Sequence, residues 1–191
     1  MRLFSMFAAM LMLGMAVPLP AARAASDDPA QPPVDLQRFM GKWYVIARIP
    51  YFAERGRVAS SEDYTLKEEG KIAVRYRYRE GFDEPVEEST ARATVKEDTG
   101  NRRWTTWRLA VVPTKYRILE VAPDYSWALV DYPGRDLAWV LSRAPDMEHK
   151  QYRTLVDRLD HEHGVNVDKL KRVAQRRDQV GKLGFEVPKR P

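Results

Sequence analysis

The sequence contains no cysteine. This absence excludes disulfide bonds, thiolate metal sites and cysteine nucleophiles. It also excludes the attachment of a lipid to a cysteine behind a signal peptide. We therefore expect the mature chain to be soluble, and to reach its fold without cross-links or a lipid anchor.

Histidine is scarce: the chain has three, and all lie between residues 149 and 163. None falls in a segment of β-type sequence, so none is placed to ligate a haem inside a sheet structure. Asp157 and His161 are spaced to share a metal ion, but an exposed pair of this kind is usually only solvated. The sequence also lacks Gly-x-Ser-x-Gly, a Gly-rich phosphate loop and His-Glu-x-x-His. We predict no catalytic residue, no metal site and no cofactor, and hence no enzyme.

Residues 1–25 have the features of a secretory signal peptide. Arg2 provides a positive start, residues 3–17 are nearly all apolar, and Ala22-Arg23-Ala24 is a small-x-small cleavage sequence. An apolar run of about 15 residues is too short to cross roughly 30 Å of hydrocarbon as a helix. The sequence thus predicts a cleaved signal peptide and a periplasmic or secreted protein, with an uncleaved N-terminal anchor as the alternative.

The positive charge is unevenly distributed. Loss of Arg2 and Arg23 with the signal peptide would lower the net charge from +5 to +3. From Lys169 onward there are eight cations and two carboxylates, a net +6, which leaves −3 for the mature body. The basic character therefore belongs to a tail, and not to a nucleic-acid-binding surface. We expect the basic tail, residues 176–191, to be disordered and able to contact an anionic membrane surface.

The segment between the signal peptide and this tail reads as a linker followed by one β-rich domain. Residues 26–33 are polar and rich in proline, typical of a linker, and residues 34–40 fit a short helical turn. Runs of β-type sequence, each stopped by Gly, Pro, Asp or Asn, follow at 43–50, 60–67, 71–79, 87–96, 103–111, 116–122, 126–132 and 137–143. The alternation of apolar and arginine side chains over 72–79 indicates a wall with one buried and one solvated face.

After Pro145 the apolar period changes to three and four residues, which predicts one amphipathic helix over 147–162. Such a helix suits packing against the outside of a sheet. The fold class is therefore mainly β: an eight-stranded antiparallel up-and-down barrel, which leaves no open edge, with one C-terminal α-helix packed outside.

The pattern Gly41-Lys42-Trp43 at the first strand, with a lone Arg143 ending the last strand, resembles the signature of the lipocalin family. Trp43-Tyr44-x-Ile46-Ala47-Arg48 and the segment 135–145 are similar to the bacterial outer-membrane lipocalins and their plant stress-induced relatives. The likeness spans about 34–173, and we expect the barrel and its helix to form one domain over 34–175. The resemblance implies that Trp43 plugs the closed end of the barrel, that Arg143 covers its indole, and that the barrel is a cup for a small apolar molecule.

Strand alternation assigns side chains to the inside of this cup. If Trp43 and Arg143 face inward, so do the residues two positions apart from them. This rule predicts that Ala47, Ile49, Trp139 and Leu141 contact the ligand. For the strand 103–111, the relatives' phenylalanine at position 108 favours an inward face with Trp104 and Arg108, opposite Tyr116 and Ile118, over the face with Thr105, Trp107 and Leu109. The closure residues are Gly41, Trp43 and Arg143.

Arg108 stands where the relatives usually carry phenylalanine, and it bears on the class of ligand. An inward arginine needs a partner, because an unpaired desolvated charge costs several kcal/mol. Its partner is either Glu120 on the next strand or the acidic head of a bound ligand. An alternative shift of the strand would turn Arg108 to solvent.

The function that these features predict is binding or transport of a fatty acid or lysophospholipid in the cell envelope, without a nucleic-acid partner. Two alternatives stay open: an isomerase or esterase that uses the same cup, and an interaction module whose barrel is filled by its own side chains.

The predicted cleavage site can be tested by N-terminal sequencing of protein expressed with its complete leader. The expected product begins at Ala25 or Ser26 and appears in the soluble periplasmic or culture fraction. An intact Met1 in the membrane fraction would contradict this assignment.

Overall fold

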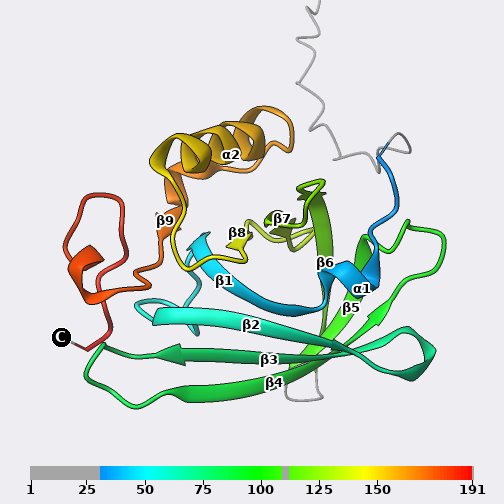
Figure 1. Ribbon diagram of the computed structural model, residues 1–191, viewed down its shortest axis with the longest axis horizontal. Helices are drawn as coiled ribbons and strands as arrows, with labels where there is room; N and C mark the ends of the chain where they lie inside the picture. Colours follow the sequence, from blue (N-terminus) through cyan, green and yellow to red (C-terminus); the bar gives the residue numbers. More distant parts are fainter. Residues whose placement is uncertain (1–30, 109–111, 191) are drawn as a thin grey trace, which may run out of the picture.

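The computed structural model describes residues 31–108 and 112–190. Eight antiparallel strands follow one another around a closed barrel, and the last strand pairs with the first (Figure 1). The strands are β1 (Gly41–Arg48), β2 (Val58–Leu66), β3 (Lys71–Arg79), β4 (Glu87–Val95), β5 (Arg103–Arg108), β6 (Val112–Val121), β7 (Trp127–Asp131) and β8 (Ala138–Ser142). This confirms the predicted barrel. The predicted signal peptide and most of the predicted linker lie outside the described residues.

One helix covers the outside of the barrel, as expected. Helix α2 (His149–His161) buries Leu155 and Leu159 against Ile46, Leu129 and Val140 of the wall (Figure 1). Burial of each leucine stabilises the contact by about 2 kcal/mol relative to an exposed side chain. The helix begins two residues later than the apolar period suggested. No helix in the described part of the chain is long and apolar enough to cross a membrane.

A short helix, α1 (Leu36–Phe39), closes one end of the barrel. Asp35 caps it by accepting a hydrogen bond from the backbone N–H of Arg38, and Phe39 is completely buried. The Trp43 indole N–H donates to the Phe39 carbonyl oxygen at 2.8 Å. The tryptophan that opens β1 is therefore bonded to the helix that lies over the barrel floor.

Arg143 lies across Trp43 at this end. Its guanidinium carbon is 3.7 Å from the centre of the indole, and it donates to the carbonyl oxygens of Arg38, Phe39, Met40 and Lys42. Gly41 has φ +87°, and a Cβ there would lie 3.5 Å from an Arg143 nitrogen, so glycine suits both the backbone and the space. One side chain thus ties α1, β1 and β8 together.

A β-bulge in β1 changes which of its side chains face the barrel interior and which face outward. Val45 pairs with Leu141, but Ala47, and not Ile46, pairs with Val140. The extra residue reverses the alternation. Ala47 and Ile49 therefore lie in the outer cluster beneath α2, and the prediction that they face the interior is wrong.

The C-terminal segment is ordered in the structure, so the prediction of a disordered tail is also wrong. Residues 167–169 and 177–179 form short 3₁₀ helices, η2 (Val167–Lys169) and η3 (Arg177–Gln179), and β9 (Lys171–Arg172) pairs with β1. Beyond β9 the chain lies at the end of the barrel opposite α1 (Figure 1). The physical reason is that acidic loops at this end supply partners for the basic residues.

Trp43→Ala is expected to lower the free energy of unfolding by roughly 3–5 kcal/mol, since it leaves a cavity at the barrel floor. Arg143→Ala should cost less, and the two residues should show a coupling of about 1 kcal/mol from the cation–π contact. Urea unfolding of the wild type, both single variants and the double variant measures this. Strictly additive effects would contradict the proposed closure.

Candidate ligand-binding site

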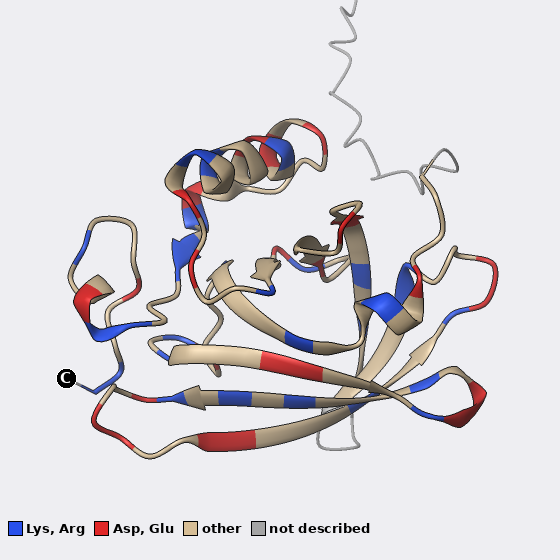
Figure 2. Cartoon of the chain, in the orientation of Figure 1, with Lys and Arg blue, Asp and Glu red and all other residues tan. Residues whose placement is uncertain are grey.

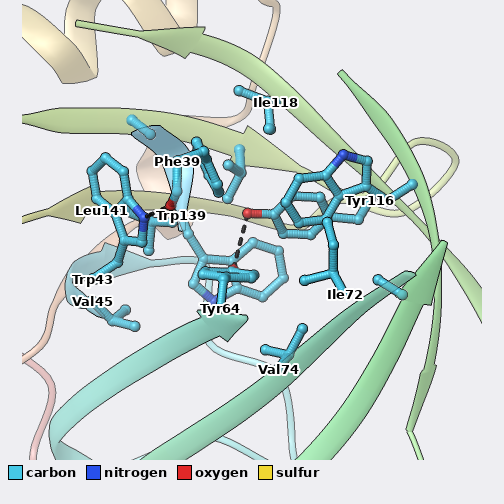
Figure 3. Packing of buried hydrophobic residues seen from close by; sticks show 14 of the residues in the cluster. Phe39, Trp43, Val45, Tyr64, Ile72, Val74, Tyr116, Ile118, Trp139 and Leu141 are labelled. Carbon is cyan, nitrogen blue, oxygen red and sulfur yellow. Dashed lines mark hydrogen bonds between the residues drawn. The ribbon is translucent and has the colours of Figure 1, made fainter. Parts of the chain in front are cut away.

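The inner face of the barrel is apolar and aromatic. The inner cluster contains the predicted residues Trp104, Tyr116, Ile118, Trp139 and Leu141 together with Trp43 (Figure 3). Near the closed end, Phe39 packs edge-on against Trp104, and Trp104 stacks on Tyr116 with ring centres 4.9 Å apart. This end of the interior is filled by protein side chains.

On one strand, β4, the exposure of the inner face rises toward the other end of the barrel. On β4, Ala93, Ala91 and Ser89 share the face that pairs with Ile72, Val74 and Tyr76 of the inner wall. Ala93 is buried, Ala91 is half-buried and Ser89 is exposed. Exposure on this face of β4 therefore rises toward the end opposite α1, which we call the open end.

Polar groups occur at mid-depth among the aromatic side chains. The Tyr64 hydroxyl donates to the Glu62 carboxylate and lies 3.1 Å from the Tyr116 hydroxyl (Figure 3). Burial of the hydroxyl, and then the adjacent Glu62 charge, raise the pKa of Tyr64 well above its ordinary value. These hydroxyls can hydrogen-bond a polar group of a molecule bound in the interior.

A buried arginine, Arg48, lies on the inner side of β1 near the open end. It pairs in register with Trp139 and is fully buried. Its guanidinium donates to the Glu186 carboxylate at 2.7 and 3.0 Å and to the Tyr76 hydroxyl at 3.1 Å. Burial opposes the charge, but the neighbouring Tyr76, Glu186 and Glu54 together raise the pKa of Arg48 above its ordinary value.

Sequence reasoning missed Arg48 because strict alternation from Trp43 turned it outward. The bulge between Val45 and Ala47 brings it to the inner face instead. Glu54 was missed too: it belongs to the β1–β2 loop, is buried, and accepts a hydrogen bond from the Trp139 indole at 3.4 Å. The sequence offered no periodic signal for a loop residue that folds back into a barrel.

Arg108 ends β5, where its backbone pairs with Ala91 and Val112. Its side chain lies outside the described part of the structure. The expected partner Glu120 is not available to an inward residue: a bulge in β6 places Leu119 in the outer cluster and Glu120 beside His163, 2.7 Å away, and Arg158, 2.9 Å away. Of the two partners expected for Arg108, Glu120 is thus engaged by groups on the outer side of the barrel, and the head group of a ligand stays a prediction.

Glu120, Glu162 and His163 form a group of possible metal ligands whose ligand atoms lie within 4.8 Å of one another. Arg158, however, makes ion pairs with both carboxylates, at 2.9 and 3.3 Å. Its guanidinium already supplies the positive charge there. The other pair considered from the sequence does not converge: the His161 ring contacts the Asp157 backbone oxygen, not its carboxylate.

Residues 34–175 match the family model described as a lipocalin-like domain. The chain belongs to the lipocalin family. It is 32% identical over 152 residues to temperature-induced lipocalin-1 of Arabidopsis thaliana, covering 74% of this chain and 80% of the relative. It is 27% identical over 136 residues to the outer membrane lipoprotein Blc of Citrobacter freundii, covering 71% and 76%.

Solved structures support the fold of this lipocalin. Insecticyanin from the tobacco hornworm Manduca sexta aligns with a TM-score of 0.59 at 19% identity, over 82% of this chain and 86% of that one. Lobster apocrustacyanin A1 aligns with a TM-score of 0.59 at 11% identity, over 74% and 80%. Lipocalins bind small hydrophobic ligands and are generally carriers rather than enzymes.

The buried hydroxyl of Tyr76 generates a pH prediction. Burial raises its pKa to about 12, so the native state retains this proton at a pH where the unfolded chain has lost it. The stability that this group contributes is therefore complete below pH ~10 and is lost as the pH rises toward 12, by about 3 kcal/mol. Urea unfolding at pH 8 and 11 should show a smaller alkaline loss for Tyr76→Phe than for wild type. Equal losses would contradict the assignment.

Proposed function

We propose that this lipocalin binds a single-chain amphiphile, a fatty acid or lysophospholipid, with the hydrocarbon chain inside the barrel and the head group toward the open end. The observation that carries the proposal is the gradient on β4, from buried Ala93 to exposed Ser89. Beside that face lies an apolar and aromatic interior, and its hydroxyl and charged groups include those around Arg48 near the open end.

The energetics of such a ligand are adequate. A chain of about 16 carbons that leaves water gains up to about 0.8 kcal/mol per methylene, or roughly 12 kcal/mol. Association costs about 4 kcal/mol or more. The remaining ~8 kcal/mol corresponds to a micromolar dissociation constant.

The site of action that we propose is the cell envelope or the extracellular medium. The sequence supports this through its signal-peptide features. The bacterial relatives support it through their description as outer membrane lipoproteins. Since this chain has no cysteine, it would act there without their lipid attachment.

The sequence offers Arg108 as one candidate partner of an acidic head group. Titration of hexadecanoate into wild type and Arg108→Met tests this candidate. Binding at least tenfold weaker in the variant would assign the head group to Arg108, and equal affinity would remove Arg108 from the head-group site.

Ser89 and Thr90 provide a matched pair to test binding inside the barrel. Both are exposed neighbours on β4, but Ser89 pairs with Tyr76 on the inner face and Thr90 pairs with Arg75 on the outer face. A tryptophan at 89 should obstruct the entrance, whereas one at 90 should not.

The measurement is a titration of a fluorescent fatty acid into wild type, Ser89→Trp and Thr90→Trp. The expected result is a loss of affinity of tenfold or more for Ser89→Trp alone. Equal affinity of all three proteins would show that the ligand binds outside the barrel. No binding by wild type would favour the alternative of a filled barrel.

A further inference from the structure

The seam between β1 and β2 is closed by their own hydrogen bonds over only half its length. They pair from Gly41 to Tyr44, and beyond that point β1 pairs with β9 instead. Gln175 lies in the gap, and its amide donates to the carbonyl oxygens of Val45 and Ser60 at 2.8 and 3.0 Å. At the open end, the wall is therefore completed by the C-terminal segment.

Residues 176–190, which we call the C-terminal strap, continue from there across two loops of the open end. The backbone N–H of Lys189 donates to the Gly56 carbonyl oxygen, and that of Arg190 donates to the Glu80 carbonyl oxygen, both at 2.8 Å. The strap contacts the first loop closely: a Cβ on Gly56 would lie 2.7 Å from the Lys189 nitrogen. It thus joins the β1–β2 loop to the β3–β4 loop.

The charges of the strap match those of the loops. Arg177 pairs with Asp83, Lys189 and Arg190 pair with Glu80, and Arg190 also reaches Glu84 (Figure 2). The Arg177–Asp83 pair is exposed on both sides and contributes little, on the order of 0–1 kcal/mol. Glu80, by contrast, is buried, and only its partners Lys189 and Arg190 are exposed. The strap is thus held by one exposed ion pair at Arg177 and by partly buried pairs at Glu80.

One residue of the strap differs from the others. Glu186 is 7% exposed, and its carboxylate accepts bonds from Arg48 and, at 3.1 Å, from the backbone N–H of Gly56. Arg48 belongs to the inner face of the barrel, next to Trp139 and Tyr76. A segment that follows the eight barrel strands thus places a carboxylate on a cation that faces the interior.

We propose that Arg48 and the Gly56 N–H form a binding site for the monoanionic head group of an amphiphile, and that Glu186 occupies this site when the strap is closed. Ligand and strap then compete for the same arginine. The inference rests on the proposed function and specifies its head-group chemistry. It favours a single negative charge because Glu54, 3.8 Å from Arg48, already offsets part of the guanidinium charge.

The test compares hexadecanoate with its uncharged methyl ester in the full mature chain. Glu186→Gln removes the competing negative charge at nearly unchanged size. Asp178→Asn is the matched control, since among the described residues Asp178 makes its ion pairs with Arg176 and Lys182 of the same strap. The Glu186→Gln variant should bind hexadecanoate at least tenfold more tightly than wild type does. Its affinity for the methyl ester should stay within twofold of the wild-type affinity. Asp178→Asn should match wild type, and adding Arg48→Met to Glu186→Gln should abolish the gain.

Lysophosphatidylglycerol distinguishes a phospholipid source from a free fatty acid, since its phosphodiester carries the same single charge. Tighter binding of either hexadecanoate or lysophosphatidylglycerol by Glu186→Gln than by wild type supports the site. The lipid with the larger gain in affinity is the preferred ligand. If Glu186→Gln does not fold, Glu80→Gln loosens the strap at Lys189 and Arg190 without touching Arg48, and should give a smaller gain of the same kind.

An equal gain for acid and ester, or no gain for either hexadecanoate or lysophosphatidylglycerol, overturns the head-group site. Ester binding in that case leaves the carrier function standing. Failure of every protein to bind acid and ester alike refutes the proposed function itself.

Discussion

The closure of β1 against its two neighbours is the constraint on which the rest of this lipocalin depends. A barrel has no edge only if its first strand bonds on both sides, and β1 bonds β2 over just four residues. At the floor, Arg143 over Trp43 holds the junction together with α1. At the open end the junction is completed by β9, Gln175 and Glu186, so that the chain's last residues are part of the wall. The two ends of the junction are thus closed by different contacts. At the floor, Arg143 makes a cation–π contact with Trp43 and bonds four carbonyl oxygens, and at the open end Glu186 of the strap makes a buried ion pair with Arg48.

The sequence predicted the architecture because the signals that define it are local. Strands such as β3 and β8 alternate without interruption, so Trp139 and Leu141 lie on the inner face as their parity required. Prediction failed where a single extra residue reverses parity. The bulge in β1 turned Ala47 outward and Arg48 inward, and the bulge in β6 turned Glu120 toward α2. Nothing in the apolar pattern marks such a bulge, because both faces of β1 are buried: one by the interior and the other by the helix.

The tail was misread for a different reason. The amino-acid composition reports the positive charge of the tail. Whether the tail is ordered, however, depends on whether the rest of the chain supplies partners for that charge. The β3–β4 loop supplies Glu80, Asp83 and Glu84, which were counted only as part of the net charge of the body. Because these carboxylates neutralise much of the strap, its basic residues are not a free anion-binding surface. The residue of the tail that we propose to act in ligand binding is therefore its buried acid, Glu186, and not its basic side chains.

The central claim is that the barrel interior holds a single-chain amphiphile. Native mass spectrometry of the protein, purified without detergent and then incubated with hexadecanoate, tests it most directly. We expect the spectra of wild type to show the mass of the chain plus one hexadecanoate. This added mass should be lost under denaturing conditions. Spectra that show only the mass of the chain, before and after incubation, would contradict it.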